Sequence, residues 1–429
     1  MNPSLVEKEA RPKTRAKDLR PLHRIVGTTI LVFTLYFGVT GLVIQSIDLR
    51  AISAHVAATD PDMLAIRESI DGTSNFAVIQ ATDYAAASLP QRFDIAEALA
   101  VVVKTARTSV AAHASITYAE LRVLDGKPVG VIRASDGSDT HIVHVDPATG
   151  AVMSTASPVA ESPPPRSLHG EAKRWHRLQK LGFGDEMEWL NGLVGIGLFS
   201  MIITGLVVYF RLVRARKRAG QNALFWSAGG RWRSLHRSIA VMAAVFLMIV
   251  SVTGTLLSID SFALGVYIDL HQTPGKHARE FPAGMTADYS SPLQDAEIPG
   301  MVQTTLSAYQ AIRGSTPINV IRLRYFSGMP QGVIITGGQD TVQLVFNAAS
   351  GRRVSMTEPN YPYTGFPFGW EEHELVKKIH RGDALGVPGR LMDVFAGCSL
   401  VFLSISGLVM YLDLRKRRKR MGRSGLYWI

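Results

Sequence analysis

The chain has 429 residues, of which 47% are hydrophobic and 19% charged, and its formal net charge is +11. About a quarter of the residues in a soluble globular protein are charged, so this composition favours an integral membrane protein. The single cysteine, Cys398, excludes a disulfide framework and a thiolate metal cluster.

Four apolar stretches are long enough to cross the ~30 Å hydrocarbon core of a bilayer as helices. They are residues 25–47, 190–210, 236–259 and 391–412. Three segments carry seven Lys or Arg residues each, namely 1–24, 211–235 and 413–429. By the positive-inside rule these basic segments face the cytoplasm, near acidic lipid, and both termini lie there. The net charge therefore reports topology, and a nucleic-acid partner is not expected.

The first long connection, residues 48–165, faces outside and contains strand and turn patterns. We expect a helix over 93–109 and short strands over 116–123, 129–134, 141–145 and from Ala151. A proline-rich spacer, 162–165, separates this region from a histidine-bearing segment at 166–189.

The second long connection, residues 260–360, repeats this pattern. A helix is expected over 300–313 and strands over 318–324, 332–336 and 342–347. Asp146 to Gly150 matches Asn347 to Gly351, and each reads as a strand, a turn that needs glycine, and a strand leaving it. Each connection is thus expected to form a small α+β domain.

A histidine precedes the first and the third apolar stretch in the same way. Leu22-His23-Arg24 leads one and Leu235-His236-Arg237 leads the other. A Val-Thr-Gly triplet ends eighteen residues after each histidine, at Gly41 and Gly254. Eighteen residues make about five turns of helix, so each histidine shares a helix face with its glycine.

The second and fourth stretches make another matched pair. His176-Arg177 leads toward an Ile-Thr-Gly ending at Gly205, and His380-Arg381 leads toward an Ile-Ser-Gly ending at Gly407. His169 and His373 stand seven residues before these histidines. The chain is therefore an internal duplication.

The paired histidines predict two haem sites. His23 and His236 would lie at equal depth at the cytoplasmic edge, and His176 and His380 at matched positions outside. A six-coordinate b-type haem takes a neutral histidine nitrogen on each face of its iron. Because no Cys-x-x-Cys-His motif occurs, covalent c-type attachment is excluded. We predict that these four histidines are the metal ligands of about two haems.

Neighbouring residues could complete the haem sites. Four arginines directly follow the histidines and could pair haem propionates, although the positive-inside rule explains the first two equally well. They are Arg24, Arg237, Arg177 and Arg381. Four glycines could let a flat macrocycle approach the backbone, the alternative being ordinary small-residue helix packing. Gly41 and Gly254 would lie near the outer pair, and Gly205 and Gly407 near the inner pair.

The spacing leaves the roles of His169 and His373 open. Each lies one heptad before its partner, on the same side if the segment is helical. They could be haem ligands in place of His176 and His380, propionate donors, or groups that touch a substrate. The aromatic segment at 361–370 favours an interfacial belt, with the lining of a ligand cavity as the alternative.

These motifs resemble the PepSY-associated transmembrane family, most closely its siderophore-iron reductase branch of FoxB type. The resemblance covers about residues 20–415 and rests on the two Leu-His-Arg motifs, the two His-x6-His segments and the two Asp/Asn-x-x-Ser/Thr-Gly turns. It implies an α-helical integral membrane protein with four transmembrane helices and two small α+β PepSY-like periplasmic domains. It also implies a multi-pass protein of the bacterial inner membrane that carries haem and reduces a ferric siderophore, such as a hydroxamate, outside.

The chain departs from relatives that carry a fused flavin or nicotinamide domain, because no Gly-x-Gly-x-x-Gly follows a strand. Electrons are therefore expected from a separate donor, either a cytoplasmic reductase or membrane quinol. Beyond the outer histidines, the candidates for contact with the siderophore are His169, Trp370, Glu372 and His373. Two other functions compete with this one: a non-enzymatic envelope protein that binds peptides or regulates a protease, and a metal transporter.

Overall fold

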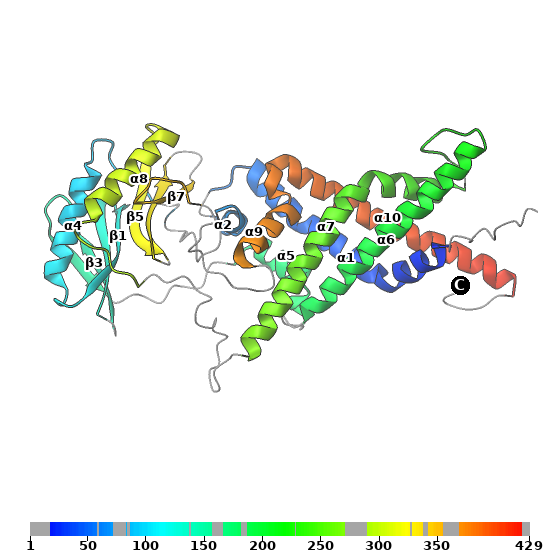
Figure 1. Cartoon of the computed structure of the whole chain (residues 1–429), viewed down its shortest axis with the longest axis horizontal. Coiled ribbons are helices and arrows are strands. Elements are labelled where there is room, and N and C mark those ends of the chain that lie inside the picture. Colours follow the sequence, from blue (N-terminus) through cyan, green and yellow to red (C-terminus); the bar gives the residue numbers. More distant parts are fainter. Residues whose placement is uncertain are drawn as a thin grey trace, which may run out of the picture. The chain divides into compact units, whose positions relative to one another are not determined.

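The computed structural model describes residues 18–57, 60–71, 83, 86–136, 139–156, 166–181, 187–227, 229–270, 290–326, 328–337, 342–354 and 369–422. Its helices are α1 (Arg20–Ser53), α2 (Pro61–Asp71), α4 (Ile95–Ser109), α5 (Leu168–His176), α6 (Glu188–Arg218), α7 (Arg231–Leu270), α8 (Ile298–Arg313), α9 (Gly369–His380) and α10 (Gly386–Arg420). Its strands are β1 (Ser115–Leu124), β2 (Lys127–Ser135), β3 (Thr140–Val145), β4 (Val152–Ala156), β5 (Ile318–Phe326), β6 (Met329–Thr336) and β7 (Gln343–Asn347) (Figure 1).

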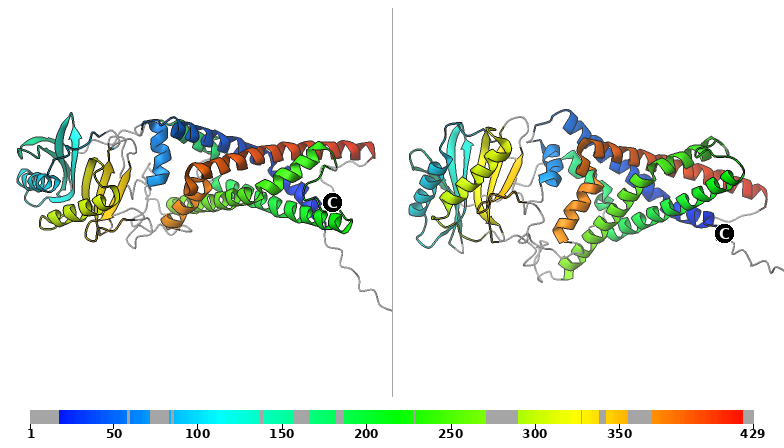
Figure 2. Two further views of the ribbon diagram at one scale, coloured as in Figure 1. Left: turned by 90° about the horizontal axis from the view of Figure 1, so that it is seen from above. Right: turned by 45° about the horizontal axis from the view of Figure 1, so that its top comes forward.

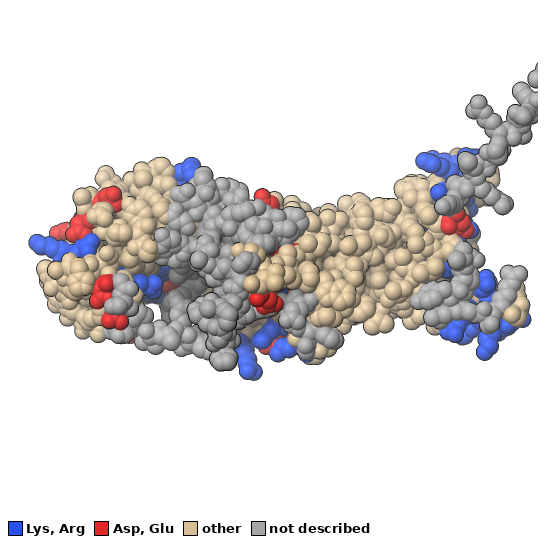
Figure 3. All heavy atoms as spheres, turned by 60° about the horizontal axis from the view of Figure 1, so that its bottom comes forward, with Lys and Arg blue, Asp and Glu red and all other residues tan. Residues whose placement is uncertain are grey.

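Four of these helices, α1, α6, α7 and α10, are long and apolar enough to cross a membrane. They contain the four predicted spans, and large apolar side chains such as Val32, at 74% exposure, and Val245, at 58%, face outward from them. Figure 3 shows a stretch along these helices without charged side chains, with Lys and Arg gathered near the helix ends. The chain is therefore a multi-pass membrane protein.

All four long helices extend further than the hydropathy pattern indicated, and α1 and α7 do so past a buried aspartate. Asp48 was expected to end the first span and Asp260 the third, yet α1 continues to Ser53 and α7 to Leu270. Both aspartates are buried. A helix can outlast its apolar stretch because its backbone bonds are internal and a packed neighbour covers the polar side chains.

The chain divides into two compact units. The first consists of Met1–Gly38, Val194–Val252 and Phe395–Ile429, and the second of Val39–Leu193 and Thr253–Val394. In the first unit, side chains of α7 and α10 form a buried apolar cluster. Within the same unit, Gly38 of α1 lies against Val401 of α10, so the helices pack closely at small residues.

The second unit contains one antiparallel sheet of seven strands in the order β4-β3-β2-β1-β5-β6-β7. All the strands predicted in both connections are present, but they do not form two separate domains. The two halves join where β1 pairs with β5, so that Glu120 lies opposite Arg322. Joining covers two strand edges that would otherwise expose unpaired backbone groups.

One face of the sheet carries α4 and α8, which lie side by side against it (Figures 1 and 2). In α4 the buried residues recur at helical spacing, as Leu99, Val102 and Ala106 illustrate. A Cβ at Gly130 would fall 2.2 Å from Val102, and one at Gly332 would fall 2.1 Å from Thr305 of α8. Glycine is needed at both places because each helix approaches its strand closely.

The opposite face of β1 and β5 carries buried charges. Arg322 forms ion pairs with Glu120, at 2.6 Å, and with Asp83, at 3.1 Å. Arg122 contacts the same two carboxylates, at 3.2 and 3.1 Å. Two cations and two anions thus balance one another where the two halves of the sheet meet.

The repeated turns take the predicted form. Gly150 and Gly351 have φ values of +69° and +72°, and the side chains of Asp146 and Asn347 accept hydrogen bonds from backbone N–H groups within their turns.

Three short α-helices, α2, α5 and α9, also belong to the second unit. The segments containing His169 and His373 are helical, as α5 and α9, whereas α2 was not expected, because its sequence shows little apolar periodicity. The spacer 162–165 and the aromatic residues 361–368 lie outside the described residues.

Candidate functional site

His23 extends from α1 to the part of α6 where Thr204 precedes Gly205. The Nδ1 atom of His23 lies 3.0 Å from the hydroxyl oxygen of Thr204. A Cβ built on Gly205 would lie 3.3 Å from Cε1 of the same ring. The imidazole therefore fits against a hydroxyl residue and the glycine that follows it.

His236 of α7 meets α10 in the same way. Its Nδ1 lies 2.8 Å from the hydroxyl of Ser406, and a Cβ on Gly407 would lie 3.8 Å from its Cε1. The first unit thus holds both histidines of this pair, each against a different long helix.

The second unit repeats the arrangement with the short helices. His176, at the end of α5, has Nδ1 2.8 Å from the hydroxyl of Thr40, beside Gly41 of α1. His380, at the end of α9, has Nδ1 3.0 Å from the hydroxyl of Thr253 of α7. A Cβ on the following Gly254 would lie 3.1 Å from Cε1 of His380. All four histidines thus occupy what we call an imidazole cradle, a hydroxyl residue followed by glycine on a neighbouring helix.

The cradles of His23 and His236 determine which ring nitrogen these two histidines offer. The hydroxyl of Thr204 donates to the carbonyl oxygen of Ser200, at 2.8 Å, and that of Ser406 to Leu403, at 3.3 Å. A hydroxyl has one proton, so its oxygen must accept the Nδ1 proton of the histidine. The neutral imidazole then carries its lone pair on Nε2, the nitrogen suited to an axial bond with iron.

The His176 side chain is held in the neutral form that metal ligation requires. Burial, together with the charges of His380 and Arg177, lowers the pKa of His176 to about 3. At neutral pH the ring therefore has no competing proton on its ligating nitrogen.

The glycines have a more specific role than the sequence indicated. They were expected to let a macrocycle approach the backbone, but an added Cβ at each would meet the edge of an imidazole ring. Glycine here makes room for the ligand side chain. The available space differs among the four, because a Cβ at 3.1 or 3.3 Å would be tighter than most real contacts and the ring would have to shift by a few tenths of an ångström, whereas 3.6 and 3.8 Å are ordinary.

This difference predicts a graded effect of alanine substitution. Gly254→Ala should displace the His380 ring and reduce the haem retained per chain, while Gly407→Ala, with 3.8 Å available, should retain the wild-type amount. Haem per chain and the low-spin electron paramagnetic resonance spectrum would be measured for both variants. If both variants retained the same amount of haem, the glycines would not position the histidine rings.

The four arginines expected to meet haem propionates lie in different surroundings. Arg177 pairs with the buried carboxylate of Glu188 at 2.7 Å, and Arg381 lies 3.5 Å from Asp48. Arg237 stacks over Trp226 and donates to its carbonyl oxygen at 3.1 Å. Arg24 bonds to the carbonyl oxygen of Arg20. The propionate role therefore remains a prediction, best suited to Arg177 and Arg381, which already hold carboxylates.

His169 and His373 have carboxylate partners in place of hydroxyls. The Nδ1 atom of His169 lies 2.6 Å from Asp48, and that of His373 lies 2.6 Å from Asp260. Among the glycines that the structure describes, none lies against either ring in the way that one lies against each of the other four. The side chain of His169 is only 3% exposed, which leaves no surface for a bulky siderophore. The structure therefore does not support the predicted substrate contact for this residue.

Two of the remaining substrate candidates lie on α9. Glu372 is exposed, beside His373, whose side chain is 21% exposed. Trp370 belongs to the same helix, but its side chain lies outside the described residues. The predicted contact with a substrate stays a prediction for these residues.

A b-type haem fits the donor set that the chain presents. Each cradle turns Nδ1 toward a hydroxyl, and for His23 and His236 the lone pair then lies on Nε2, the nitrogen suited to iron. Each hydroxyl residue directly precedes its glycine, a signal present in the sequence and not used. Asp48, Asp260 and Arg390 were also missed, because their partners are far away in the chain.

Comparison with known families gives one match. A family model described as the PepSY-associated TM region matches residues 63–413. The match includes His169, His176, His236, His373 and His380. It begins after α1, so the assignment of His23 depends on the internal repeat and on the cradle in α6. A search among curated proteins found no match.

Proposed function

The chain belongs to the family of the PepSY-associated TM region, and on this premise we propose that it is a haem-dependent membrane oxidoreductase. It would hold about two b-type haems and pass electrons across the bilayer to a ferric siderophore. The observation that carries the proposal is the fourfold imidazole cradle, since ordinary helix packing does not require a hydroxyl at Nδ1 and a glycine at Cε1 in four equivalent places.

The residues of the chain would bind and orient the cofactor. His23 and His236 would hold one haem, and His176 and His380 the other. The cradle hydroxyls would orient each imidazole through its Nδ1 atom. Bound haem supplies a one-electron carrier whose potential depends on its axial ligands and surroundings.

The direction of transfer follows from charge. Each of the segments 1–24, 211–235 and 413–429 contains seven Lys or Arg residues. We propose that these segments face the cytoplasm of a bacterial inner-membrane protein, with the sheet, α5 and α9 in the periplasm. Electrons from a separate reductase or from quinol would enter near His23 and His236 and leave near His176 and His380.

A ferric chelate is an electron acceptor that suits electrons leaving near His176 and His380. One electron converts ferric to ferrous iron, which hydroxamate oxygens bind less tightly, so that the siderophore releases its metal. The exposed Glu372, next to His373 on α9, offers a polar contact for such a ligand.

The proposal can be tested in proteoliposomes that contain the purified protein. After dithionite reduction, a ferric hydroxamate added at the periplasmic face should reoxidise the haem, and a ferrous-specific chelator should trap the iron. The variant His176→Ala, which lacks one proposed ligand, is the matched control and should react at the rate of empty liposomes. A colourless but folded preparation from haem-sufficient cells would refute the haem assignment. Reoxidation only from the cytoplasmic face would refute the proposed substrate reaction.

A further inference from the structure

The two short helices that carry His176 and His380 do not span the membrane, so other contacts must hold them in place. Each is attached at two points to one long helix. α5 contacts α1 through His176 and Thr40, at 2.8 Å, and through His169 and Asp48, at 2.6 Å.

The second short helix follows the same plan. α9 contacts α7 through His380 and Thr253, at 3.0 Å, and through His373 and Asp260, at 2.6 Å. Both attachments connect two histidines of the short helix with one hydroxyl and one carboxylate of the long helix. The duplication has therefore preserved a pair of contacts, which a chance surface interaction would not explain.

The spacing of the contacts matches along both partners. On α5 the two histidines are seven residues apart, and on α1 Thr40 and Asp48 are eight apart in the opposite order. At 1.5 Å per residue these separations are about 10.5 and 12 Å, as expected for antiparallel helices in register. A single contact would leave the short helix free to pivot, whereas two contacts fix its rotation and its translation.

We infer that His169 with Asp48, and His373 with Asp260, are positioning pairs that hold α5 and α9 in register, so that His176 and His380 are presented to one haem. This inference rests on the proposed function. It assigns His169 and His373 neither to the iron nor to the siderophore.

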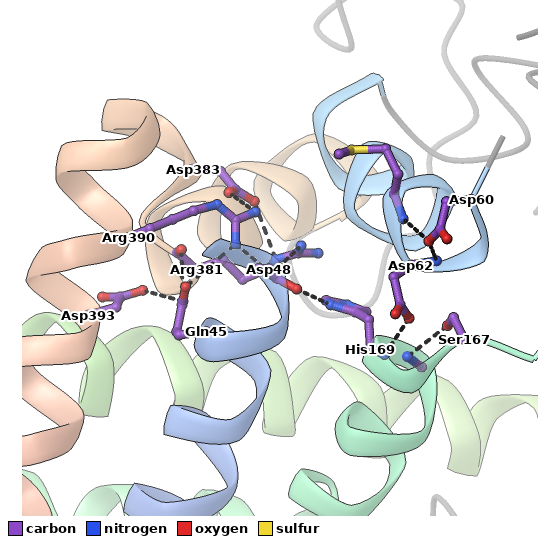
Figure 4. A network of polar contacts seen from close by, with 12 residues as sticks. Gln45, Asp48, Asp60, Asp62, Ser167, His169, Arg381, Asp383, Arg390 and Asp393 are labelled. Carbon is purple, nitrogen blue, oxygen red and sulfur yellow. Dashed lines mark hydrogen bonds and ion pairs between the residues drawn. The ribbon is translucent and has the colours of Figure 1, made fainter. Parts of the chain in front are cut away.

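The surroundings of the first pair support a holding role. Asp48 is fully buried and also forms ion pairs with Arg390 and Arg381, as Figure 4 shows. On the other side, the carboxylate of Asp62 in α2 accepts the backbone N–H of His169 at 2.9 Å. The buried pair of His169 and Asp48 is thus held by Asp62 of α2, by Arg390 of α10 and by Arg381, which directly follows α9.

The second pair has fewer supports. Among the described residues, the Oδ1 atom of the buried Asp260 has no hydrogen-bond partner, and its Oδ2 atom lies 2.6 Å from Nδ1 of His373. Removing His169 would leave Asp48 paired with two arginines, but removing His373 would leave Asp260 as a buried carboxylate without its hydrogen-bond donor. Since a buried polar group without a partner is costly, the loss of His373 should have the larger effect.

The holoprotein with both haems bound tests the inference through variants at the two positions. His169→Gln and His373→Gln should keep both haems low-spin, as iron ligation is intact, yet shift the midpoint potential of one haem and leave the other unchanged. The shift should be larger for His373→Gln. His176→Gln, in contrast, should abolish one low-spin signal, and His113→Gln, at an exposed histidine, should change nothing.

A conservative substitution separates positioning from general damage. Asp260→Asn keeps an oxygen that can accept the Nδ1 proton of His373, so it should shift the potential less than Asp260→Ala does. Loss of a low-spin signal in His169→Gln would overturn the inference, because it would make His169 an iron ligand.

Amide hydrogen exchange in the haem-free protein supplies a measurement that does not depend on the cofactor. His169→Gln should accelerate exchange in α5, and His373→Gln in α9, by at least about tenfold, which corresponds to ~1.4 kcal/mol of lost docking free energy. If the wild-type protein binds no haem but exchange responds in this way, the proposed function fails and the docking role stands. If neither exchange nor potential responds, the positioning pairs are refuted.

Discussion

Replacing His23 or His236 with alanine should remove one haem and leave the other in place. Each pair occupies its own cradles, formed by α6 and α10 for these two histidines. The cradles of His176 and His380 are formed by α1 and α7 at Thr40 and Thr253, each seventeen residues after His23 or His236 along the chain. Haem per chain, measured after acid-acetone extraction, should therefore fall by about half, since no covalent attachment is available.

The reciprocal variants provide the control. His176→Ala and His380→Ala should remove the second haem and retain the first, so that optical redox titration of the two sets of variants shows complementary components. His55→Ala, at an exposed histidine, should retain both. If all four ligand variants kept two haems, the ligand assignment would be wrong even for a protein that contains haem.

Replacing Arg322 with alanine should destabilise the sheet by about 3–5 kcal/mol, the range measured when one partner of a buried ion pair is removed. The Arg322 side chain is 3% exposed and pairs with Glu120 and Asp83. The buried carboxylates raise the pKa of Arg322 well above its usual value, although burial opposes this effect, so the residue stays charged. Its loss would leave two buried carboxylates with the single cation of Arg122.

Urea unfolding, followed by amide exchange in β1 and β5, would measure this loss. The double variant Glu120→Leu/Arg322→Leu should be much closer to wild type, because it removes one cation together with one anion and leaves Asp83 with Arg122. Arg133→Ala, at an exposed arginine on the neighbouring strand, should change stability by less than about 0.5 kcal/mol. If Arg322→Ala had no larger effect than Arg133→Ala, the cluster would not hold the two halves of the sheet together.

The positions of the helices and strands follow largely from local patterns. The four spans were evident because about twenty consecutive apolar residues have few alternatives to a membrane helix. Each predicted strand was found within a few residues of its observed bounds, since alternation in segments such as Ala119 to Leu121 records one apolar and one polar face. The helix α2 was not predicted, because its few apolar residues, Met63 and Ile66 among them, form only a small cluster.

The sequence by itself determined that the chain crosses the membrane, that it is duplicated, and which histidines correspond in the two halves. These properties are carried by hydropathy and by spacing along the chain. Only the tertiary structure decided that the two halves share one sheet through β1 and β5, and that each histidine meets a hydroxyl residue and a glycine on another helix. It also separated His169 and His373, bound to Asp48 and Asp260, from the four cradled histidines. Such pairings join residues more than a hundred positions apart, and their partners depend on how helices pack against one another, which no local pattern encodes.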